Sequence, residues 1–251
     1  MMVTIGLIAA MPLESAALLR HVTDWQPITI GRLRGQRFEL QEKACLMVTS
    51  GMGVQRAREA AGILVERFSP GILISFGIAG AVEADLEIGD VVLCDAFCHL
   101  QMRSLGAHTL LASWPAAAYQ AASESLASRG KKLFRGTAIT TGGSQLAASQ
   151  LDGIAHPVLE METAGIASLA AEKGLPLLSL RAISDGPSAP IPFDLAEMMD
   201  ENANLRTDRL IKAILLHPRI LFQSMRMRRN SVVAADYAAL ALHSALSHLP
   251  G

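Results

Sequence analysis

The chain opens with a continuous run of apolar residues, Val3 to Ala10, which is followed by Pro12 and a helical stretch from Leu13 to His21. A short apolar run without polar alternation is typical of a strand that is buried on both faces. Because proline is favoured in the first turn of a helix, the strand is expected to pass directly into one. This order is the first indication of an α/β fold.

The same succession of strand, turn and helix continues along the chain. Strands that lead into glycine-rich turns and then helices favour a mostly parallel sheet with helices on both faces. Gly174 is placed to end a helix, since glycine is favoured just after the last helical residue. The further strands expected are Arg37–Leu40, Ala44–Thr49, Gly71–Phe76, Val91–Asp95, Gly136–Thr140 and Leu175–Ile183, and the further helices are Val54–Phe68, Pro115–Ser128 and Glu162–Lys173.

The end of the chain differs from the rest in its charge. We expect one catalytic domain over residues 1–192 and a helical extension over residues 193–251 that packs on it, because no repeat or low-complexity linker divides the chain. Seven basic residues and one acid lie within 206–229, between Arg206 and Arg229. Apolar residues are interleaved with these charges, so the segment either lies on an anionic membrane surface or docks on the acidic remainder of the chain.

Composition excludes several classes of protein. With 251 residues, of which 51% are hydrophobic and 18% charged, the chain is long enough for a buried core and is not a disordered segment. The 22 Lys+Arg and 23 Asp+Glu residues give a net charge of -1, so no nucleic-acid partner is expected. Cys45, Cys94 and Cys98 are odd in number and lack zinc-site spacing, which predicts reduced thiols and no metal.

The first residues do not have the pattern of a secretion signal. The opening apolar run has no basic region before it, and the longest uncharged stretch is too polar to span a bilayer. We therefore expect a cytoplasmic protein. If the basic segment binds lipid, the protein would be peripheral to the inner face of the membrane.

Three polar clusters follow predicted strands, where an open α/β sheet places its ligands. The first is Glu14, just after the opening strand. A carboxylate there either interacts favourably with the helix dipole or serves as a general base at a crevice. The residue alone leaves both roles open.

Two glycine-rich turns form the second cluster, Ser50 to Gly53 and Gly77 to Gly80. Glycine lets backbone N–H groups approach an anion or a sugar closely. Neither turn matches a dinucleotide-binding or P-loop motif, and tight packing under the sheet explains them equally well. A phosphate or water site here would use Ser50, Gly51, Gly53 and Gly77 together with the basic side chain of Arg56.

The third cluster joins Glu160-Met161-Glu162 to the segment from Arg181 to Asp185. Glu162 would open a helix and Asp185 would end a strand, so two acids far apart in the sequence would meet at one rim of the sheet. Converging acids are typical of proton chemistry. An ion pair between Arg181 and one of these acids would be purely structural.

Taken in order, these clusters resemble the nucleoside phosphorylase and nucleosidase family. The similarity runs from about Val3 to Asp185, and the nearest branch is the methylthioadenosine/S-adenosylhomocysteine nucleosidases. The resemblance implies a three-layer α/β/α sandwich around a mixed, partly barrel-like sheet, in dimers or larger oligomers. The motifs that carry it are Ala10-Met11 with Glu14, Ser50-Gly51-Met52-Gly53, Gly77-Ile78-Ala79-Gly80, Gly89-Asp90-Val91-Val92, Met161-Glu162-Thr163-Ala164 and Arg181-Ala182-Ile183-Ser184-Asp185.

The resemblance also implies how these residues cleave the bond between a purine and C1′ of ribose. Asp185 would donate a proton to purine N7, Glu162 would accept hydrogen bonds from the ribose hydroxyls, and Glu14 would activate water. No metal or organic cofactor is implied, and inorganic phosphate would be the co-substrate of a phosphorylase. The remaining substrate-binding positions would be Met161, which packs on the ribose, Arg181, which orients its neighbours, and Glu160, Ser184, Ile78, Ala79, Gly80, Gln145 and Leu146.

Two positions depart from the family pattern. Ile78 stands where the nucleosidases commonly carry a serine that helps to hold the nucleophile, and an alkyl group cannot hydrogen-bond water. Gln145 stands where a base-stacking phenylalanine is usual. In addition, Leu216-His217-Pro218 and the arginine-rich segment are similar to the hopanoid-associated phosphorylase branch, which acts on an adenosine joined to a hydrophobic polycycle.

We therefore expect an enzyme that hydrolyses the N-glycosidic bond of a purine nucleoside, a 5′-modified adenosine, and releases adenine. One alternative is phosphorolysis of a nucleoside with a hydrophobic 5′ substituent. A second alternative is a nucleoside-binding module without turnover. The expected partners are the small-molecule nucleoside and a second copy of the chain.

Overall fold

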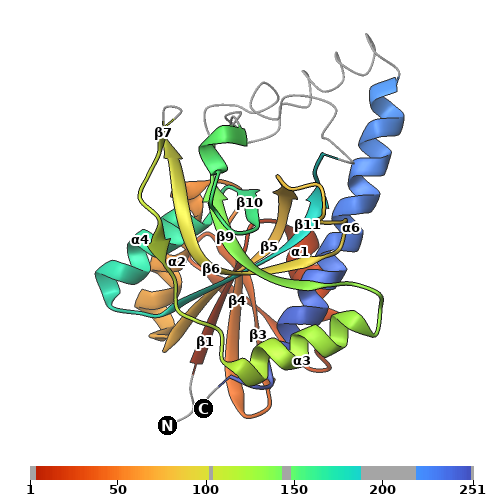
Figure 1. The fold of residues 1–251 in the computed structure, drawn as a ribbon. Coiled ribbons are helices and arrows are strands. Elements are labelled where there is room, and N and C mark those ends of the chain that lie inside the picture. The colour runs from red at the N-terminus through yellow and green to blue at the C-terminus, as the bar shows by residue number, and fades with distance from the viewer. Residues whose placement is uncertain (1–3, 102–103, 143–147, 188–218, 250–251) are drawn as a thin grey trace.

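The computed structural model describes residues 4–101, 104–142, 148–187 and 219–249 (Figure 1). Within these ranges one 11-stranded sheet has the order β10-β9-β6-β11-β5-β1-β4-β3-β2, and β7 and β8 pair with β6. The strands are β1 Thr4–Ala9, β2 Trp25–Ile30, β3 Leu33–Leu40, β4 Lys43–Thr49, β5 Ile72–Ala81, β6 Val91–Gln101, β7 Ser104–Leu105, β8 Thr109–Leu110, β9 Leu133–Thr140, β10 Pro157–Glu160 and β11 Leu177–Asp185. The helices are α1 Pro12–Leu19, α2 Val54–Phe68, α3 Ala116–Ala127, α4 Thr163–Lys173 and α6 Arg219–Leu246, with a short 3-10 helix η1 at Ala148–Leu151.

Four neighbouring strands at the centre of the sheet, β11, β5, β1 and β4, run parallel. They are buried along most of their length, as expected where helices cover both faces. The expectation of a mostly parallel sheet holds for this centre and for a second parallel group, β10, β9 and β6. β2, β3 and β4 are antiparallel because tight turns connect them, and β6 runs antiparallel to β11.

One short strand closes part of the sheet on itself. β10 pairs in parallel with β9 and antiparallel with β5. Because β9, β6, β11 and β5 are already neighbours in the sheet, this second pairing completes a ring of five strands. The partly barrel-like sheet implied by the family resemblance is therefore confirmed.

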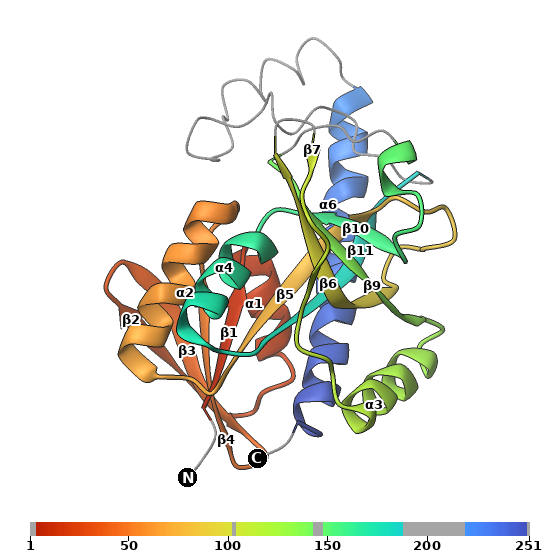
Figure 2. The ribbon, with the colours of Figure 1, turned by 60° about the vertical axis from the view of Figure 1, so that its left-hand side comes forward.

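Helices lie on both sides of the sheet, which confirms the three-layer arrangement (Figure 2). On one side α2 packs against α4, and on the other α6 packs against α1, α3 and β11. The buried residues of α2 recur at helical spacing, at Ala57, Ala60, Ala61 and Leu64, so one face of the helix meets the sheet. The carboxyl-terminal half of α6 buries an alanine-rich face in the largest apolar cluster of the molecule.

Several elements differ from those expected from the sequence. The expected turn Gly77–Gly80 lies inside β5, because β11 and β10 pair with both edges of that strand. The strand that begins at Val91 continues to Gln101, well beyond Asp95. β2 and β10 were missed because β2 is an exposed edge strand and β10 has only four residues.

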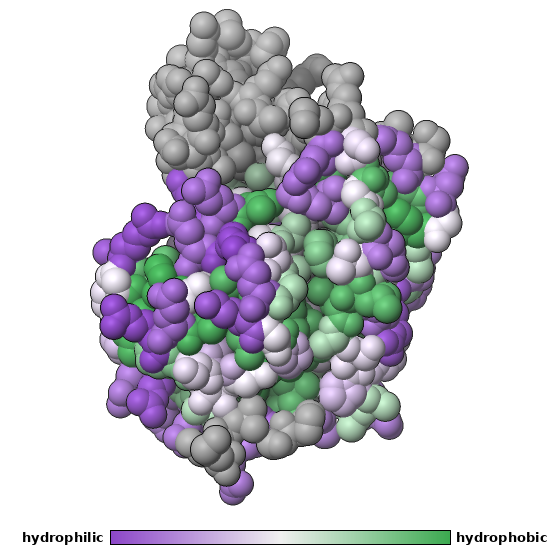
Figure 3. Space-filling view, turned by 90° about the vertical axis from the view of Figure 1, so that its left-hand side faces the viewer, coloured by the Kyte–Doolittle hydropathy of each residue, from purple (hydrophilic) through white to green (hydrophobic). Residues whose placement is uncertain are grey.

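Some of the predicted features fall outside the described residues. These are Gln145, Leu146, and the part of the basic segment that precedes Arg219. Among the described residues, no helix is long and apolar enough to cross a membrane. On the side that carries α2 and α4, hydrophilic residues predominate over one part of the surface and hydrophobic residues gather on the other (Figure 3). The predicted homodimer or larger oligomer stays a prediction.

The first turns of α2 and α4 are in direct backbone contact. A Cβ built at Gly165 of α4 would overlap the carbonyl group of Val54 in α2, so only glycine allows the two helices to approach this closely. This contact brings the loop before α2 next to the amino terminus of α4. The candidate site described below depends on that proximity.

We expect Gly165→Ala to lower the free energy of unfolding by about 1–3 kcal/mol, because backbone atoms of the two helices must move apart. Gly62→Ala in α2 is the matched control. The nearest atoms to a Cβ at Gly62 lie 3.9 Å away, and alanine is the better helix former, so this variant should be at least as stable as the wild type. Urea unfolding of the three proteins tests the contact, and equal stability of Gly165→Ala and wild type would contradict it.

Candidate active site

Four chain segments meet at the carboxyl edge of the parallel strands. β1 leads into Glu14, β4 leads into the loop Ser50–Gly53, β5 contains Gly77–Gly80, and β11 ends at Asp185. Glu162, which precedes α4, joins them because the backbone N–H of Gly53 donates to its Oε1 at 3.1 Å. The structure therefore brings the three predicted acids and both glycine segments to one edge of the sheet.

Glu14 is held in a fixed direction by the backbone. The side chain is 2% exposed, and it accepts hydrogen bonds from the N–H groups of Met11 at 2.8 Å and Ile78 at 3.0 Å. Gly77 leaves room for it, since a Cβ at that position would overlap the carboxyl group. Burial raises the pKa of Glu14 above its ordinary value, although these N–H groups act to lower it. A carboxyl group with these properties suits a general base.

The isoleucine at position 78 does not weaken this anchoring. Residue 78 reaches Glu14 through its backbone N–H, which any residue except proline supplies. The Ile78 side chain packs against the largest apolar cluster. The departure from the family's serine therefore removes a hydroxyl group but leaves Glu14 in place.

A buried ion pair lies next to Glu162. Glu160 and Arg181 are 4% and 1% exposed, and Nη2 of Arg181 lies 2.7 Å from Oε2 of Glu160. Glu160 also accepts hydrogen bonds from the backbone N–H groups of Glu162 and Thr163 and from the hydroxyls of Thr140 and Thr163. Burial acts to raise the pKa of Glu160, but the Arg181 charge and these donors hold it below its ordinary value.

These contacts match the orienting role expected of Arg181 and the structural ion pair given as an alternative. Both residues were also listed among the substrate-binding positions, which stays a prediction, and the Glu160 oxygens are occupied by protein donors. Three nitrogen-to-oxygen contacts of Arg181 are internal too, to Glu160, Ser75 and Thr163. The pair therefore positions the segment that carries Glu162. Sequence reasoning missed Ser75, Thr140 and Thr163, because nothing local marks hydroxyls that meet only when strands far apart in the chain pair.

Glu162 itself is 8% exposed. Burial and the negative charge of Glu160 raise its pKa to about 8, and the charge of Glu14 acts in the same direction. Glu14 and Glu162 are therefore within electrostatic reach of each other. Without a ligand, Glu162 holds its proton at neutral pH.

Asp185 lies at an irregularity in β11. Ile183 pairs with Ala79 and Asp185 with Gly80, so Ser184 is an extra residue that forms a β-bulge. Asp185 lies over Gly80, where a Cβ would come within 2.7 Å of Oδ2. Burial raises the pKa of Asp185, although the Ser184 hydroxyl, 2.7 Å from Oδ1, acts to lower it. A raised pKa favours the protonated form of a carboxyl group, which is the form that a general acid needs.

A cavity of about 980 Å³ adjoins this edge, between α1, α2 and the β2–β3 hairpin. Arg32, Arg34 and Arg56 line it together with Ser50 and Gly53, and none of the three acids does. The Arg56 guanidinium also packs over Gly51, since a Cβ there would lie 3.2 Å from Nη1. Of the residues predicted for a phosphate site, Ser50, Gly53 and Arg56 therefore border this cavity, whereas Gly51 lies beside the Arg56 guanidinium and Gly77 beside Glu14. Glu59 also lines the cavity and pairs with Arg32.

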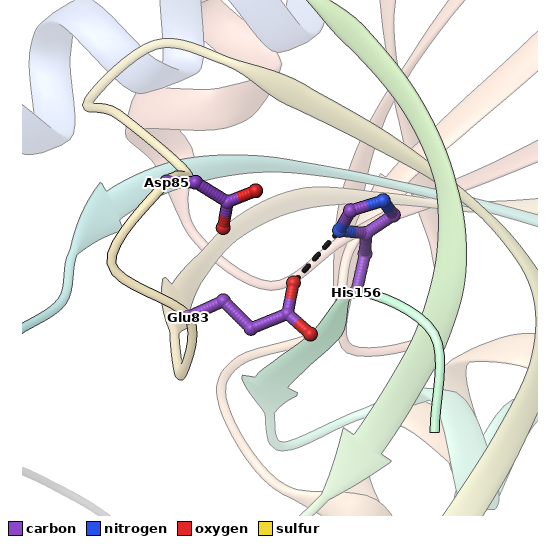
Figure 4. Close-up of side chains that lie close together, drawn as sticks. All are labelled: Glu83, Asp85 and His156. Carbon is purple, nitrogen blue, oxygen red and sulfur yellow. Dashed lines mark hydrogen bonds and ion pairs between the residues drawn. The ribbon is translucent and has the colours of Figure 1, made fainter. Parts of the chain in front are cut away.

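One group of side chains has the composition of a cation site. Glu83, Asp85 and His156 place their ligand atoms within 4.8 Å of one another, and no other such group of three occurs in the described part of the chain (Figure 4). Glu83 and His156 form an ion pair at 2.7 Å, which joins the segment after β5 to the start of β10. All three side chains reach solvent, and none belongs to the acid-lined edge. The ion pair accounts for two of them without a metal.

Comparison with known proteins identifies the family. The sequence model of the phosphorylase superfamily matches residues 4–216. The chain therefore belongs to the phosphorylase superfamily, and the family predicted from the ordered motifs is confirmed. With it, the prediction of an enzyme is confirmed.

Several relatives carry the name 5′-methylthioadenosine/S-adenosylhomocysteine nucleosidase. That of Shewanella loihica is 30% identical over 208 residues, which cover 76% of this chain and 90% of the relative. That of Oceanobacillus iheyensis is 29% identical over 208 residues, with the same coverage. Both are similar to this chain along most of their length.

Solved structures share the fold. The Neisseria meningitidis nucleosidase of the same name, in complex with methylthio-immucillin-A, has a TM-score of 0.70 at 20% identity and covers 98% of this chain and 99% of its own. Futalosine hydrolase of Helicobacter pylori has a TM-score of 0.70 at 19% identity, with 98% of both chains covered. These likenesses confirm the predicted fold class.

The raised pKa of Glu162 predicts how stability depends on pH. The unfolded chain releases this proton near the ordinary value of 4.5 and the folded chain only near 8. Between these values the folded state binds one proton more, so it loses stability as the pH rises. We expect Glu162→Gln, which cannot ionise, to gain stability relative to wild type as the pH goes from 5 to 8.

Thermal unfolding of both proteins across this range measures the effect. Glu66→Gln, at an exposed position of α2, is the matched control. A difference between Glu162→Gln and wild type that does not change with pH would contradict the assignment of this proton to Glu162.

Proposed function

We propose that the chain hydrolyses the N-glycosidic bond of a 5′-modified adenosine and releases adenine. The observation that carries this proposal is that three acids, the buried Glu14 and Glu162 and the half-buried Asp185, lie at one edge of the parallel strands. The names of the relatives, which are nucleosidases of methylthioadenosine and S-adenosylhomocysteine, support the same substrate class.

Asp185 and Glu162 act on the two ends of the bond that breaks. Cleavage gives positive charge to the ribose and negative charge to the purine. Asp185, whose pKa is raised by burial, donates a proton to N7, so the base leaves as neutral adenine. Glu162 binds the 2′- and 3′-hydroxyls, and the growing positive charge of the sugar favours the ionised form of its carboxyl group.

Glu14 activates water, which is the nucleophile. Its carboxylate takes a proton from water as the oxygen bonds to C1′, which gives a free ribose derivative. One proton is thus lost by Asp185 and one is gained by Glu14, and exchange with solvent restores both groups.

Phosphorolysis of a nucleoside with a hydrophobic 5′ substituent is the second candidate. The observation that favours it is the cavity lined by Arg32, Arg34 and Arg56, since guanidinium groups bind phosphate well. In this reaction phosphate would attack C1′ in place of water. We place it second because no acid of the site lines that cavity.

Release of free adenine with and without phosphate, together with the sugar product, distinguishes these functions. Methylthioadenosine, S-adenosylhomocysteine, adenosine and a 5′-alkyl adenosine would each be incubated with the full chain, with and without inorganic phosphate. Hydrolysis requires release without phosphate and a free sugar product. A sugar 1-phosphate would establish phosphorolysis. Tight binding without loss of the base from any substrate would overturn both and indicate a binding module.

Asp185→Asn should lower kcat by roughly 10²- to 10⁴-fold, because asparagine keeps the size and hydrogen bonding of the side chain but has no proton to transfer. Nucleoside affinity should change little. Single-turnover adenine release and equilibrium binding measure the two quantities separately. Turnover at the wild-type rate would remove Asp185 from the mechanism.

Glu14→Gln should abolish hydrolysis, because the amide cannot take a proton from water. Phosphorolysis would be spared, since phosphate is already a nucleophile. The products formed with and without phosphate measure both reactions, and Glu66→Gln again controls for a surface glutamate. Hydrolysis at the wild-type rate by Glu14→Gln would show that Glu14 only stabilises its helix.

A further inference from the structure

The amino-terminal half of α6 exposes an ordered set of side chains. Met225 is 62% exposed and Val232 is 36% exposed, and Arg226, Arg228 and Arg229 are exposed between them. With 3.6 residues per turn, Met225 and Val232 lie on one line along the helix. Arg228 lies on one side of this line, and Arg226 and Arg229 lie on the other. The five residues therefore form one face, an apolar line between basic flanks, which we call the basic face of α6.

The charge of this face is uncompensated within the described part of the chain. None of its three arginines forms an ion pair with a described acid. The sequence has no Asp or Glu from Arg219 to Ala235, and the next acid, Asp236, pairs with Arg20, just after α1. Among the described residues nothing neutralises the basic face, and its three arginines are exposed.

The rest of α6 fixes this face in space. Ala234, Ala235 and the alanines that follow are buried, and the helix packs there against α1 and α3. Its amino-terminal half rises beside the ends of β5 and β11 (Figures 1 and 2). The basic face is therefore held rigidly at the end of the molecule that carries the candidate active site.

We propose that the basic face of α6 docks on an anionic lipid surface. Apolar side chains flanked by arginines are typical of helices that lie in a membrane interface. The methionine and valine enter the boundary of the acyl chains, and the long arginine stems let the guanidinium groups reach lipid phosphates. Each arginine near such a surface strengthens binding by about fivefold.

A lipid surface fits these residues better than an acidic protein does. A stable protein interface buries about 800 Å² on each partner and needs matching shape. Two apolar residues on one line offer much less than that. A membrane needs no matching shape, and it presents anionic groups along the whole helix. This inference does not depend on the proposed reaction.

Vesicle flotation with the full chain tests the proposal. We expect binding to vesicles of phosphatidylcholine with phosphatidylglycerol, no binding to phosphatidylcholine alone, and weaker binding at high salt. Arg228→Glu with Arg229→Glu should reduce binding by roughly 25-fold or more. Met225→Ser should cause a smaller loss that persists at high salt, because the contact it removes is apolar.

Arg37→Glu with Arg67→Glu is the matched control, since it changes the net charge equally at exposed positions of β3 and α2. It should bind vesicles nearly as the wild type does, and circular dichroism and thermal unfolding show whether each variant is folded. Equal losses of vesicle binding in the two double variants would show that overall charge, and not the basic face, causes the binding, and would overturn the proposal. Failure of the folded wild type to bind anionic vesicles would overturn the proposal. The proposal would also be overturned if the α6 variants lost self-association but still bound vesicles.

Discussion

The buried ion pair between Arg181 and Glu160 is the interaction on which the candidate site depends. Two charges removed from water are stable only when they are paired and well hydrogen-bonded, and hydroxyls from three other elements complete their contacts here. The pair ties the start of α4 to β11. It therefore fixes the position of Glu162, and the charge of Glu160 helps to keep a proton on that residue. One contact thus holds the geometry of the site, and its carboxylate adds to the effect of burial on the pKa of Glu162.

Local patterns predicted the elements whose burial follows from their own sequence. The bounds of α2, Val54–Phe68, match the prediction because its apolar residues recur at helical spacing. The apolar runs of β1 and β4 were recognised for a similar reason. The edge strand β2 and the short β10 carry no such pattern, because pairing with neighbours decides their conformation. The segment Gly77–Gly80 was mistaken for a turn because glycine usually marks turns, whereas here it leaves space above a strand for Glu14 and Asp185.

The candidate acids were found from the ordered motifs, but the different environments of Glu160 and Glu162 were not. Glu160 and Glu162 are two positions apart and have the same side chain, yet one is held ionised by Arg181 and the other is held protonated. That difference arises from residues of β5, β9 and β11, which come together only in the folded sheet. Likewise, the sequence showed that the end of the chain is basic, but not that the exposed arginines of α6 flank an apolar line.

The extra residue in β11 shows that the length of the strand before Asp185 matters as well as the identity of that residue. Successive side chains of a strand point to opposite faces of a sheet, so one residue more or fewer before Asp185 would turn its carboxyl group to the other face. The number of residues before Asp185 therefore determines which way its carboxyl group points, and Ser184 is the additional residue. In a related chain that keeps the aspartate but lacks this additional residue, the carboxyl group would point to the opposite face of the sheet.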